Sequence, residues 1–397
     1  MLINLTIKIV ITGGHHSSAL PVIKKLREQY PEAQIYWFGH KFSAQGDKNP
    51  TLEFHEITAL KIPFYHIHAG KFYRTFNLKR LIKIPFGFFQ CLVLLIKLKP
   101  DAIMSFGGYI AVPTVIAGWV LGIPSITHEQ TVVAGWANWL VSKFVKKVLV
   151  SWPQSQKYFP QEKTVFVGLP LRQAIFEVKS QNFLVDNNLP TLYITAGKIG
   201  SHVINKIVGE CLADLLGICN VIHQCGDNSV YNDFDMLTNL KSGLGTTVGQ
   251  YYLRKFIFED EIGEAFAKSD LVISRSGAHT TAELLALKKP CLLIPIPWVS
   301  HNEQYENAKI LVDARLGTIL PEAKLSAQSL VDGVKMALED LDRRGNTLSD
   351  VHGSELLRFA HISPNDSISA YSDERGLNDD SADLIVRQLM SLIKKTY

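Results

Sequence analysis

Short apolar runs alternate with helical patterns along most of the chain, and this alternation constrains the fold more than any other feature. In the first half, runs typical of β-strands occupy residues 5–11, 34–38, 102–105, 125–127 and 147–151. The pattern restarts at 191–197 and continues at 220–223, 254–258, 271–274, 292–295 and 317–320. Strands that alternate with helices form βαβ units, whose strands are parallel. The sequence therefore predicts an α/β fold with two doubly wound parallel sheets.

The length of the chain agrees with two domains. It has 397 residues, of which 47% are hydrophobic, enough for two cores of ordinary size. We expect a first domain at residues 1–170, completed by a C-terminal helix at 380–397, and a second domain at 171–345. Residues 346–379 are polar and are expected to form a loop or an insertion. Residues 152–172 contain proline and glycine, and we interpret them as the linker between the domains.

Composition excludes several classes of protein. The formal net charge is +4 with no polybasic tail, so nucleic-acid binding has no support. The five cysteines are scattered without metal-ligand spacing, which favours a reducing, cytosolic compartment. The first residues alternate like a strand and lack the features of a signal peptide. Because the longest apolar stretches, 86–96 and 111–124, are shorter than the ~20 residues of a membrane span, no segment is expected to cross a bilayer.

The segment Arg275-Ser-Gly-Ala-His-Thr-Thr-Ala-Glu283 joins an apolar strand to a helix through a glycine turn. Such a turn presents backbone N–H groups at a helix N-terminus, where phosphate binds. We expect Glu283 on the first helical turn, where the helix dipole would stabilise it and it could bind a ribose diol. Further along, Asn302-Glu-Gln-Tyr-Glu-Asn307 offers carboxylate and amide groups to a sugar. Either segment alone is ordinary strand-turn-helix punctuation, but together they suggest a nucleotide-sugar site.

A second glycine turn, Thr12-Gly-Gly-His-His16, stands where the first strand should end and the first helix begin. Glycines there let the backbone approach a pyrophosphate. The two histidines do not form a metal site, because adjacent side chains diverge and no acidic or thiol partner is patterned nearby. An alternative is that His15 only caps the turn.

These motifs resemble glycosyltransferase family 28 and, within it, the MurG enzymes of bacterial peptidoglycan synthesis. The resemblance runs through residues 1–345 in motif order and spacing. Its motifs are, in chain order, Thr12-Gly-Gly-His15, Phe106-Gly-Gly-Tyr-Ile-Ala-Val-Pro113, His128-Glu-Gln-Thr131, Gly168-Leu-Pro-Leu-Arg172, Thr195-Ala-Gly-Lys-Ile-Gly-Ser201, Arg275 to Glu283, and Glu303-Gln304. Departures from the family pattern are Val10 and Ile11 in place of two leading glycines, Thr131 in place of an amide, and Lys198 in place of a hydroxyl.

The resemblance implies a GT-B fold, in which two Rossmann-like doubly wound domains face a cleft. It also implies inverting transfer of N-acetylglucosamine from UDP to the C4 hydroxyl of undecaprenyl-diphosphate-MurNAc-pentapeptide, with His15 as the candidate base. The residues implied for UDP-sugar binding are Thr12, Gly13, Gly14, Thr131, Arg172, Lys198, Glu259, Ser276, Gly277, Ala278, His279, Thr280, Glu283 and Gln304. Those implied on the acceptor side are Gly107, Gly108, Tyr109, His128, Glu129 and Gln130, although His128 and Glu129 could equally organise their loop. No metal or other cofactor is implied.

The segment 76–92 combines apolar residues at helical spacing with a basic cluster. The apolar residues are Ile82, Phe86, Phe89 and Leu92, and the basic residues are Lys79, Arg80 and Lys83. Such a composition is typical of a surface attracted to anionic lipid. The family has a hydrophobic patch ringed by positive charge at this place, which implies peripheral attachment to the cytoplasmic face of the cell membrane and collection of a lipid-linked acceptor.

Two other functions remain open from the sequence. A UDP-sugar epimerase would share the two-domain architecture but has no use for an apolar and basic patch on its first domain. A non-catalytic relative that binds UDP-sugar or lipid is favoured by the shortened first glycine loop, Thr131 and Lys198. The sequence gives no indication of the oligomeric state.

Overall fold

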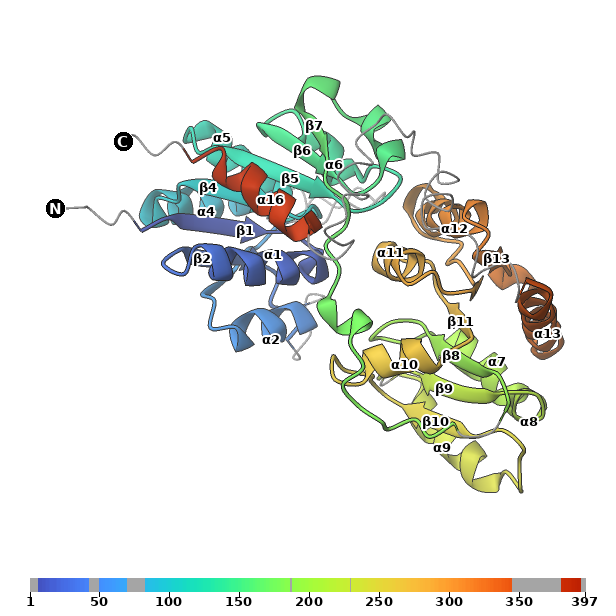
Figure 1. Cartoon of the computed structure of the whole chain (residues 1–397). Coiled ribbons are helices and arrows are strands. Elements are labelled where there is room, and N and C mark those ends of the chain that lie inside the picture. The colour runs from blue at the N-terminus through green and yellow to red at the C-terminus, as the bar shows by residue number, and fades with distance from the viewer. Residues whose placement is uncertain are drawn as a thin grey trace. The chain divides into compact units, whose positions relative to one another are not determined.

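The computed structural model describes residues 6–42, 50–69, 83–185, 188–228, 230–344 and 380–393. It divides into two compact units (Figure 1). Unit 1 comprises Met1–Leu171 and Asp379–Tyr397, and unit 2 comprises Arg172–Asn378. The polar segment 346–379 lies outside the described residues, as do Lys79, Arg80 and Ile82.

Unit 1 is built on a seven-stranded parallel sheet with the strand order β3-β2-β1-β4-β5-β6-β7. Its strands are β1 (Lys8–Thr12), β2 (Gln34–Gly39), β3 (Phe64–His66), β4 (Ala102–Ser105), β5 (Ser125–Glu129), β6 (Lys147–Val150) and β7 (Thr164–Phe166). The central strands are almost wholly apolar, because both faces of the sheet are covered by helices.

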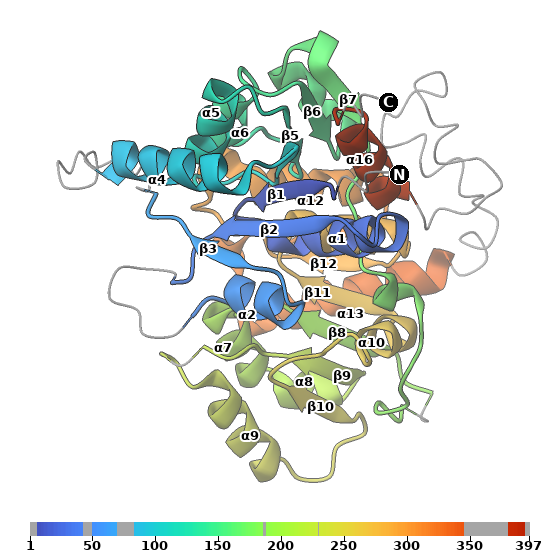
Figure 2. The same cartoon turned by 90° about the vertical axis from the view of Figure 1, so that its left-hand side faces the viewer.

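Two groups of helices cover this sheet (Figure 2). The helices are α1 (His16–Gln29), α2 (Leu52–Ala59), α4 (Lys83–Leu98), α5 (Ala111–Val120), α6 (Trp136–Val141) and α16 (Asp380–Met390), with short 3₁₀ helices η1 (Pro153–Tyr158) and η2 (Gln161–Lys163). α1 and α16 share one core cluster with Ile9 and Ile11. α4, α5 and α6 share a second cluster with Val10 and Ile103, residues whose side chains point to the opposite face. The C-terminal helix therefore packs in unit 1.

Unit 2 repeats the design with a six-stranded parallel sheet in the order β10-β9-β8-β11-β12-β13. Its strands are β8 (Thr191–Thr195), β9 (Asn220–Gln224), β10 (Tyr251–Arg254), β11 (Leu271–Ser274), β12 (Cys291–Leu293) and β13 (Gly317–Ile319). Its helices are η3 (Gln173–Phe176), α7 (His202–Glu210), α8 (Leu212–Leu216), α9 (Asp233–Gly243), α10 (Ile262–Lys268), α11 (Ala278–Ala286), η4 (Ser300–Asn302), α12 (Glu303–Asp313), η5 (Glu322–Lys324) and α13 (Ala327–Arg344). Leu192 and Ile194 face the core under α7, α8 and α13, whereas Tyr193 packs on Phe266 of α10.

The prediction of two doubly wound parallel sheets is confirmed, with local corrections. The strand predicted at 254–258 is wrong, because β10 ends at Arg254 and the apolar Phe258 after it is exposed. The short edge strands β3 and β7 were not predicted. Residues 152–172 are not a plain linker, since η1, η2 and β7 lie within them and Phe159 and Val167 are buried in unit 1.

The cysteines are free thiols in the cores of the two units. All five cysteines are buried, and none forms a disulfide. Burial raises the pKa of Cys91 and of Cys219 to about 12, so these thiols stay protonated near neutral pH. In the part of the chain that the structure describes, no helix combines the length and the apolar character needed to cross a membrane.

Each sheet has a switch point where the strand order reverses. In unit 1 it lies between β1 and β4, and in unit 2 between β8 and β11. Ligands of doubly wound proteins bind outside the carboxyl ends of the strands at such points. The four glycine-containing turns that the sequence singles out follow these four strands.

Candidate functional site

The two glycine turns of unit 1 lie against each other at the switch point. The N–H of Gly14 donates to the carbonyl of Gly107 at 3.0 Å. Gly13 has a φ of 150°, and a Cβ on it would lie 2.9 Å from the backbone of Phe106; Gly108 has a φ of 77°, and a Cβ there would lie 2.9 Å from the nitrogen of Gly14. These close backbone contacts explain why glycine stands at each position. The turns therefore form one rigid edge of the sheet.

His15 stands at the N-cap position of α1, yet its side chain makes no capping hydrogen bond. The alternative that His15 caps the turn is therefore wrong for its side chain. The residue is exposed in part. Loss of hydration by the surrounding atoms, and to a lesser degree the charge of His16, lowers the pKa of His15 to about 4. A neutral imidazole at physiological pH can accept a proton.

Thr12, the last residue of β1, is fully buried beside this turn. Its hydroxyl oxygen has no hydrogen-bond partner among the described residues. Buried hydroxyl groups are usually satisfied, so an unsatisfied one calls for an explanation such as a ligand or an ordered water. Val10 and Ile11, which replace the leading glycines of the family motif, are buried strand residues of β1.

His128 and Glu129 end β5 and organise the loop that follows it. The Nε2 of His128 lies 3.1 Å from the carbonyl of Gly168, and burial lowers its pKa to about 4. The carboxylate of Glu129 accepts hydrogen bonds from Thr131, from the N–H of Gly135 and from Asn138. Glu129 thus holds the loop after β5 in place. Thr131 belongs to the same set of hydrogen bonds, because its hydroxyl donates to the Glu129 carboxylate.

Gln130, the third residue of that motif, is also held in place. Its Oε1 accepts from the hydroxyl of Ser18 at 2.8 Å, and its carbonyl accepts from the indole of Trp152 at 3.1 Å. Tyr109, in the second glycine turn, is partly buried and its ring lies 4.9 Å from that of His40. The acceptor-side residues predicted from the sequence are therefore brought together at one end of the unit 1 sheet.

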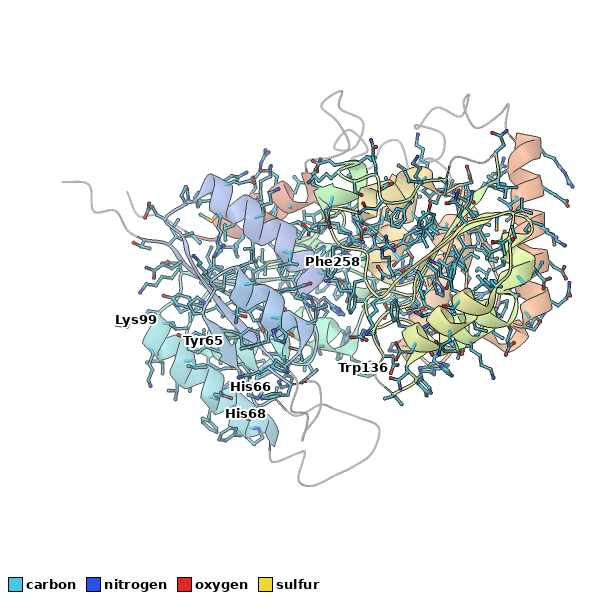
Figure 3. The ribbon with its side chains drawn as sticks, turned by 90° about the horizontal axis from the view of Figure 1, so that it is seen from below. Tyr65, His66, His68, Lys99, Trp136 and Phe258 are labelled. Atoms are coloured by element: carbon cyan, nitrogen blue, oxygen red, sulfur yellow. The ribbon has the colours of Figure 1, made fainter. Side chains whose placement is uncertain are left out.

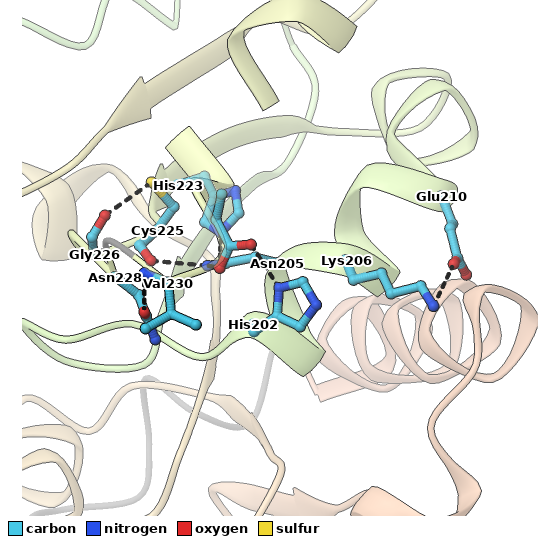
Figure 4. A network of polar contacts seen from close by, with 10 residues as sticks. His202, Asn205, Lys206, Glu210, His223, Cys225, Gly226, Asn228 and Val230 are labelled. Atoms are coloured by element: carbon cyan, nitrogen blue, oxygen red, sulfur yellow. Dashed lines mark hydrogen bonds and ion pairs between the residues drawn. The ribbon is translucent and has the colours of Figure 1, made fainter. Parts of the chain in front are cut away.

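A polar network joins α7, the helix after the glycine turn that follows β8, to β9 and to Asp233 of α9 (Figure 4). His202, the first residue of α7, donates from Nδ1 to Asp233 at 2.6 Å, and Asn205 donates to the same carboxylate at 2.8 Å and to the carbonyl of Cys225 at 2.9 Å. The Nε2 of His223 lies 3.1 Å from the Oδ1 of Asn205. Asp233 is only 1% exposed, so it needs these donors. This network could not be predicted from the sequence, because its members come from separate segments.

The segment from Arg275 to Glu283 folds as predicted into a turn and a helix. Gly277 is the N-cap of α11, whose first residue is Ala278. Glu283 therefore lies in the second turn of the helix and not in the first, and the prediction of its position was wrong. Glu283 is only 5% exposed.

Glu283 forms a bidentate ion pair with Arg172. The guanidinium donates from Nε at 2.8 Å and from a terminal nitrogen at 3.1 Å. Burial by itself would lower the pKa of Arg172, but the Glu283 carboxylate outweighs it and raises the pKa. A forked pair of this kind fixes both side chains. The Arg172 side chain remains 34% exposed, so part of its charge faces solvent.

Other predicted residues of unit 2 hold the turns in place. Arg275 donates to the carbonyl of Ile294 at 2.9 Å and to the hydroxyl of Ser201 at 2.8 Å. The hydroxyl of Ser276 donates to the carbonyl of Gln304 at 2.7 Å, and the Oε1 of Gln304 accepts from the N–H of Ile296 at 3.0 Å. The Ser276 hydroxyl and the Gln304 oxygen are thus already used within the protein. Their remaining groups for a ligand are the backbone N–H of Ser276 and the Gln304 amide nitrogen.

The remaining predicted residues of unit 2 lie on turns at the same end of the sheet. Lys198 and Glu259 are exposed, and His279 and Thr280 are partly exposed in the first turn of α11. The described residues contain no group of three or more His, Cys, Asp or Glu that could hold a metal ion.

The apolar surface predicted on unit 1 is present but larger and differently phased. The exposed large apolar residues of α4 are Phe86, Phe89, Val93 and Ile96. Leu92 packs against the core, so its assignment to the surface was wrong. Exposed apolar side chains continue on the neighbouring helices α5 and α6, and these are Trp119, Val120, Trp136 and Trp139 (Figure 3 labels Trp136). We call these eight residues the apolar face. Its four members on α5 and α6 were not predicted from the sequence.

Two family models match the chain, the glycosyltransferase family 28 N-terminal domain at residues 9–150 and the glycosyltransferase family 28 C-terminal domain at residues 191–355. The chain is 32% identical over 372 residues to UDP-N-acetylglucosamine–N-acetylmuramyl-(pentapeptide) pyrophosphoryl-undecaprenol N-acetylglucosamine transferase 3 of Bacillus thuringiensis (strain Al Hakam). The match covers 90% of this chain and 99% of the relative. The chain belongs to glycosyltransferase family 28.

Solved structures agree with the family 28 assignment at the level of the fold. The crystal structure of Acinetobacter baumannii MurG matches with a TM-score of 0.66 and 22% identity, over 97% of this chain and 99% of that one. A UDP-GlcNAc 2-epimerase from Neisseria meningitidis bound to UDP-GlcNAc matches with a TM-score of 0.58 and 14% identity, over the same shares of the two chains. The architecture is that of the GT-B glycosyltransferases, with two Rossmann-like parallel-sheet domains.

Proposed function

We propose that the chain is an inverting glycosyltransferase that moves N-acetylglucosamine from UDP-GlcNAc to the C4 hydroxyl of undecaprenyl-diphosphate-MurNAc-pentapeptide, which converts lipid I to lipid II. One observation carries the proposal: the chain aligns over 99% of the length of a curated transferase of this activity. The turns described above supply groups that suit the two substrates, and each unit is assigned one of them.

In this proposal unit 2 binds UDP-GlcNAc. The N–H groups at the start of α11 lack acceptors within the helix and bind the diphosphate, together with the turn from Thr195 to Ser201 and the charge of Lys198. Glu283 binds the ribose hydroxyls, and the exposed fraction of Arg172 faces the diphosphate. The backbone at Glu259 contacts the uracil. The amide nitrogen of Gln304 binds a sugar hydroxyl.

Replacing Glu283 with alanine is expected to weaken UDP binding by about 1–3 kcal/mol, the cost of losing hydrogen bonds to a charged group. Glu283→Gln, which keeps the shape and one acceptor, should give a smaller loss. Calorimetric titration with UDP measures both. Glu339→Ala removes an exposed carboxylate from α13 of the same unit and should leave the affinity unchanged. An unchanged affinity in Glu283→Ala would show that Glu283 does not bind the ribose.

The acceptor belongs to unit 1 in this proposal, and Gly107, Gly108 and Tyr109 of the second glycine turn line its site. Thr12, Gly13 and Gly14 of the first glycine turn, and Thr131, are assigned to the donor sugar. The neutral imidazole of His15 takes the proton from the C4 hydroxyl as its oxygen attacks the anomeric carbon. The bond from that carbon to the UDP oxygen breaks, and the configuration at the carbon inverts. The negative charge that develops on the leaving diphosphate is stabilised by the helix dipole of α11 and by the cations Arg172 and Lys198.

Transfer of radiolabelled sugar from UDP-GlcNAc to a lipid I analogue tests the proposed function. Labelled lipid II with the inverted linkage supports it. Release of an epimerised free sugar without lipid labelling would replace it with epimerase chemistry. UDP binding without any turnover would assign the chain to the non-catalytic relatives.

We also propose that the apolar face attaches the protein peripherally to an anionic membrane, at its cytoplasmic side. Phe86 and Phe89 are 59% and 60% exposed, and Trp136 is 71% exposed, so their rings can enter the acyl boundary. Lys143 lies over the ring of Trp139 at 4.0 Å, which places a positive charge beside the aromatic residues. The sequence adds Lys79, Arg80 and Lys83 close to the start of α4.

The double substitution Phe86→Ala/Phe89→Ala is expected to weaken binding to anionic vesicles by about 2 kcal/mol, or about 30-fold, because each ring loses apolar area that the lipid would cover. Reversing the charges of Lys79, Arg80 and Lys83 should weaken it by about 1 kcal/mol for each charge, and added salt should weaken the wild type in the same way. Vesicle co-sedimentation measures this. Val248→Ala, an exposed apolar residue of unit 2, is the control. If Val248→Ala weakens vesicle binding as much as Phe86→Ala/Phe89→Ala does, the apolar face is not the membrane surface.

A further inference from the structure

Three histidines and a lysine gather at the carboxyl edge of the unit 1 sheet, outside every motif considered so far. His40 and Lys41 follow β2, His66 ends β3, and His68 lies two residues later. The ring centroids of His40 and His66 are 5.3 Å apart, and those of His66 and His68 are 4.4 Å apart. We call these four residues the histidine cluster. The ring of Tyr109, from the second glycine turn, lies 4.9 Å from that of His40 and joins the cluster to the acceptor side.

Hydrogen bonds show which ring nitrogens of the cluster can donate. The Nδ1 of His66 accepts the N–H of Lys41 at 3.1 Å, so the neutral ring carries its proton on Nε2. The Oε1 of Gln90 accepts the N–H of His68 at 2.9 Å and lies 3.4 Å from its Nδ1. The Nε2 of Gln90 donates to the carbonyl of His66 at 2.7 Å. Gln90 thus fixes the end of β3 against α4, and both rings are left with an Nε2 that can donate to an anion when it is protonated.

The charge around the cluster favours an anion. Within the described ranges, none of Lys41, His66 and His68 forms an ion pair with a carboxylate. The ammonium group of Lys41 instead lies over the rings of Phe42 and Phe54, at 5.5 and 4.8 Å. Burial, more than any other cause, lowers the pKa of His66; the neighbouring His68 and Lys41 lower it further, and a hydrogen bond with the backbone of Gly39 opposes them. Positive groups that disfavour one another in this way are stabilised together by a bound anion.

The cluster adjoins the exposed stripe of α4. The rings of His68 and Phe86 are 5.9 Å apart, and a Cβ on Gly87 would lie 3.0 Å from the carbonyl of His68. Figure 3 shows His66 and His68 beside α4. From Phe86 the stripe continues through Phe89 and Val93 to Ile96, a distance of about 15 Å along the helix. A cationic end and an apolar track that meet in this way match an amphiphile with an anionic head and a linear apolar tail.

We propose that the histidine cluster binds the diphosphate of the lipid-linked acceptor, and that the α4 stripe holds the first isoprenoid units of its tail. This inference rests on the proposed function, because that function supplies a diphosphate lipid as the acceptor. The Nε2–H groups of His66 and His68 and the ammonium group of Lys41 donate to the diphosphate oxygens. Phe86 and Phe89 contact the tail.

Binding of farnesyl diphosphate to the full chain tests the proposal by calorimetry, with inorganic pyrophosphate and farnesol as comparison ligands. The wild type is expected to bind farnesyl diphosphate more tightly than either comparison ligand. His66→Gln/His68→Gln keeps an acceptor for the N–H of Lys41 but removes both imidazole Nε2 donors. It should weaken binding of farnesyl diphosphate about 10–100-fold, the loss of charge-assisted hydrogen bonds. Binding of farnesol should stay unchanged.

Control variants separate a binding role from a folding role. His55→Gln removes an exposed histidine of α2 outside the cluster and should bind farnesyl diphosphate as the wild type does. His66→Gln/His68→Arg returns a permanent cation and should recover part of the affinity. Retained binding of farnesol and an unchanged thermal unfolding midpoint in every variant show that unit 1 is folded.

Several outcomes would overturn the proposal. Unchanged binding of farnesyl diphosphate to His66→Gln/His68→Gln would remove the diphosphate site, and equal affinity of the wild type for inorganic pyrophosphate would remove the tail site. These failures leave the proposed function standing if the wild type still labels a lipid I analogue. Conversely, a wild type that binds farnesyl diphosphate but transfers no sugar to any acceptor would contradict the proposed function and not the binding site.

Discussion

Replacing His15 with alanine is expected to lower turnover about 10²–10⁴-fold, the effect of removing a general base. The affinity for UDP should stay nearly unchanged, because the proposed contacts to the uracil and the ribose come from unit 2 and His15 itself is assigned to the acceptor. Steady-state transfer assays and calorimetric titration with UDP measure the two quantities. His55→Ala is the control: His55 is an exposed histidine on α2 of the same unit, outside both glycine turns, so its loss should change turnover little.

The pH dependence of turnover is a second test of His15 as the general base. Since the pKa of His15 is lowered to about 4, its ring is neutral at pH 7 and can act as a base. Turnover should therefore fall only in acid, as the pH drops through that pKa and the ring becomes protonated. The His15→Ala variant should lose this acid limb. Nearly intact turnover in His15→Ala would make His15 a structural residue of the turn.

The sequence predicted the strands that are buried on both faces and missed those that are not. The strands at 102–105 and 271–274 were predicted at their observed bounds, because every residue in them is apolar or small and fully buried. β3 and β7 have three residues each and lie at the edges of the sheet, where burial is partial and the apolar signal is weak. The strand predicted at 254–258 failed because Phe256 and Phe258 are apolar without being core strand residues.

The candidate site shows the same division between local and long-range information. The turn before α11 follows from a glycine between a strand and a helix former, so it could be predicted from neighbouring residues. The pairing of Glu283 with Arg172 joins residues 111 positions apart, and that of His202 with Asp233 joins residues 31 apart. No periodicity encodes such pairs. The phase of α4 has a similar cause: the packing of Leu92 against the core turns Val93 outward.

Gly200→Ala is expected to destabilise unit 2 by about 2–5 kcal/mol. The φ of Gly200 is 77°, a left-handed value that costs other residues about 1–2 kcal/mol. An added Cβ would also lie 1.9 Å from the carbonyl oxygen of Cys225, and such overpacking typically costs a further 1–3 kcal/mol. Thermal unfolding should show a midpoint lower by about 5–15 °C. UDP binding should weaken as well, since this residue holds the turn that we assign to the diphosphate against the turn after β9.

Alanine substitutions at two other glycines of unit 2 separate the cost of the left-handed backbone from the cost of the steric contact with Cys225. Gly197 has a φ of 78° but no atom within 4 Å of an added Cβ, so Gly197→Ala should show only the cost of about 1–2 kcal/mol for the left-handed backbone. Gly243, the last residue of α9, has neither a positive φ nor a neighbour within 4 Å, and Gly243→Ala should be neutral or stabilising by about 0.4–1 kcal/mol. If Gly200→Ala loses no more stability than Gly197→Ala, the contact with Cys225 yields at little cost. The turn after β8 would then not be fixed by its neighbour, and a rigid diphosphate cradle there would have to be abandoned.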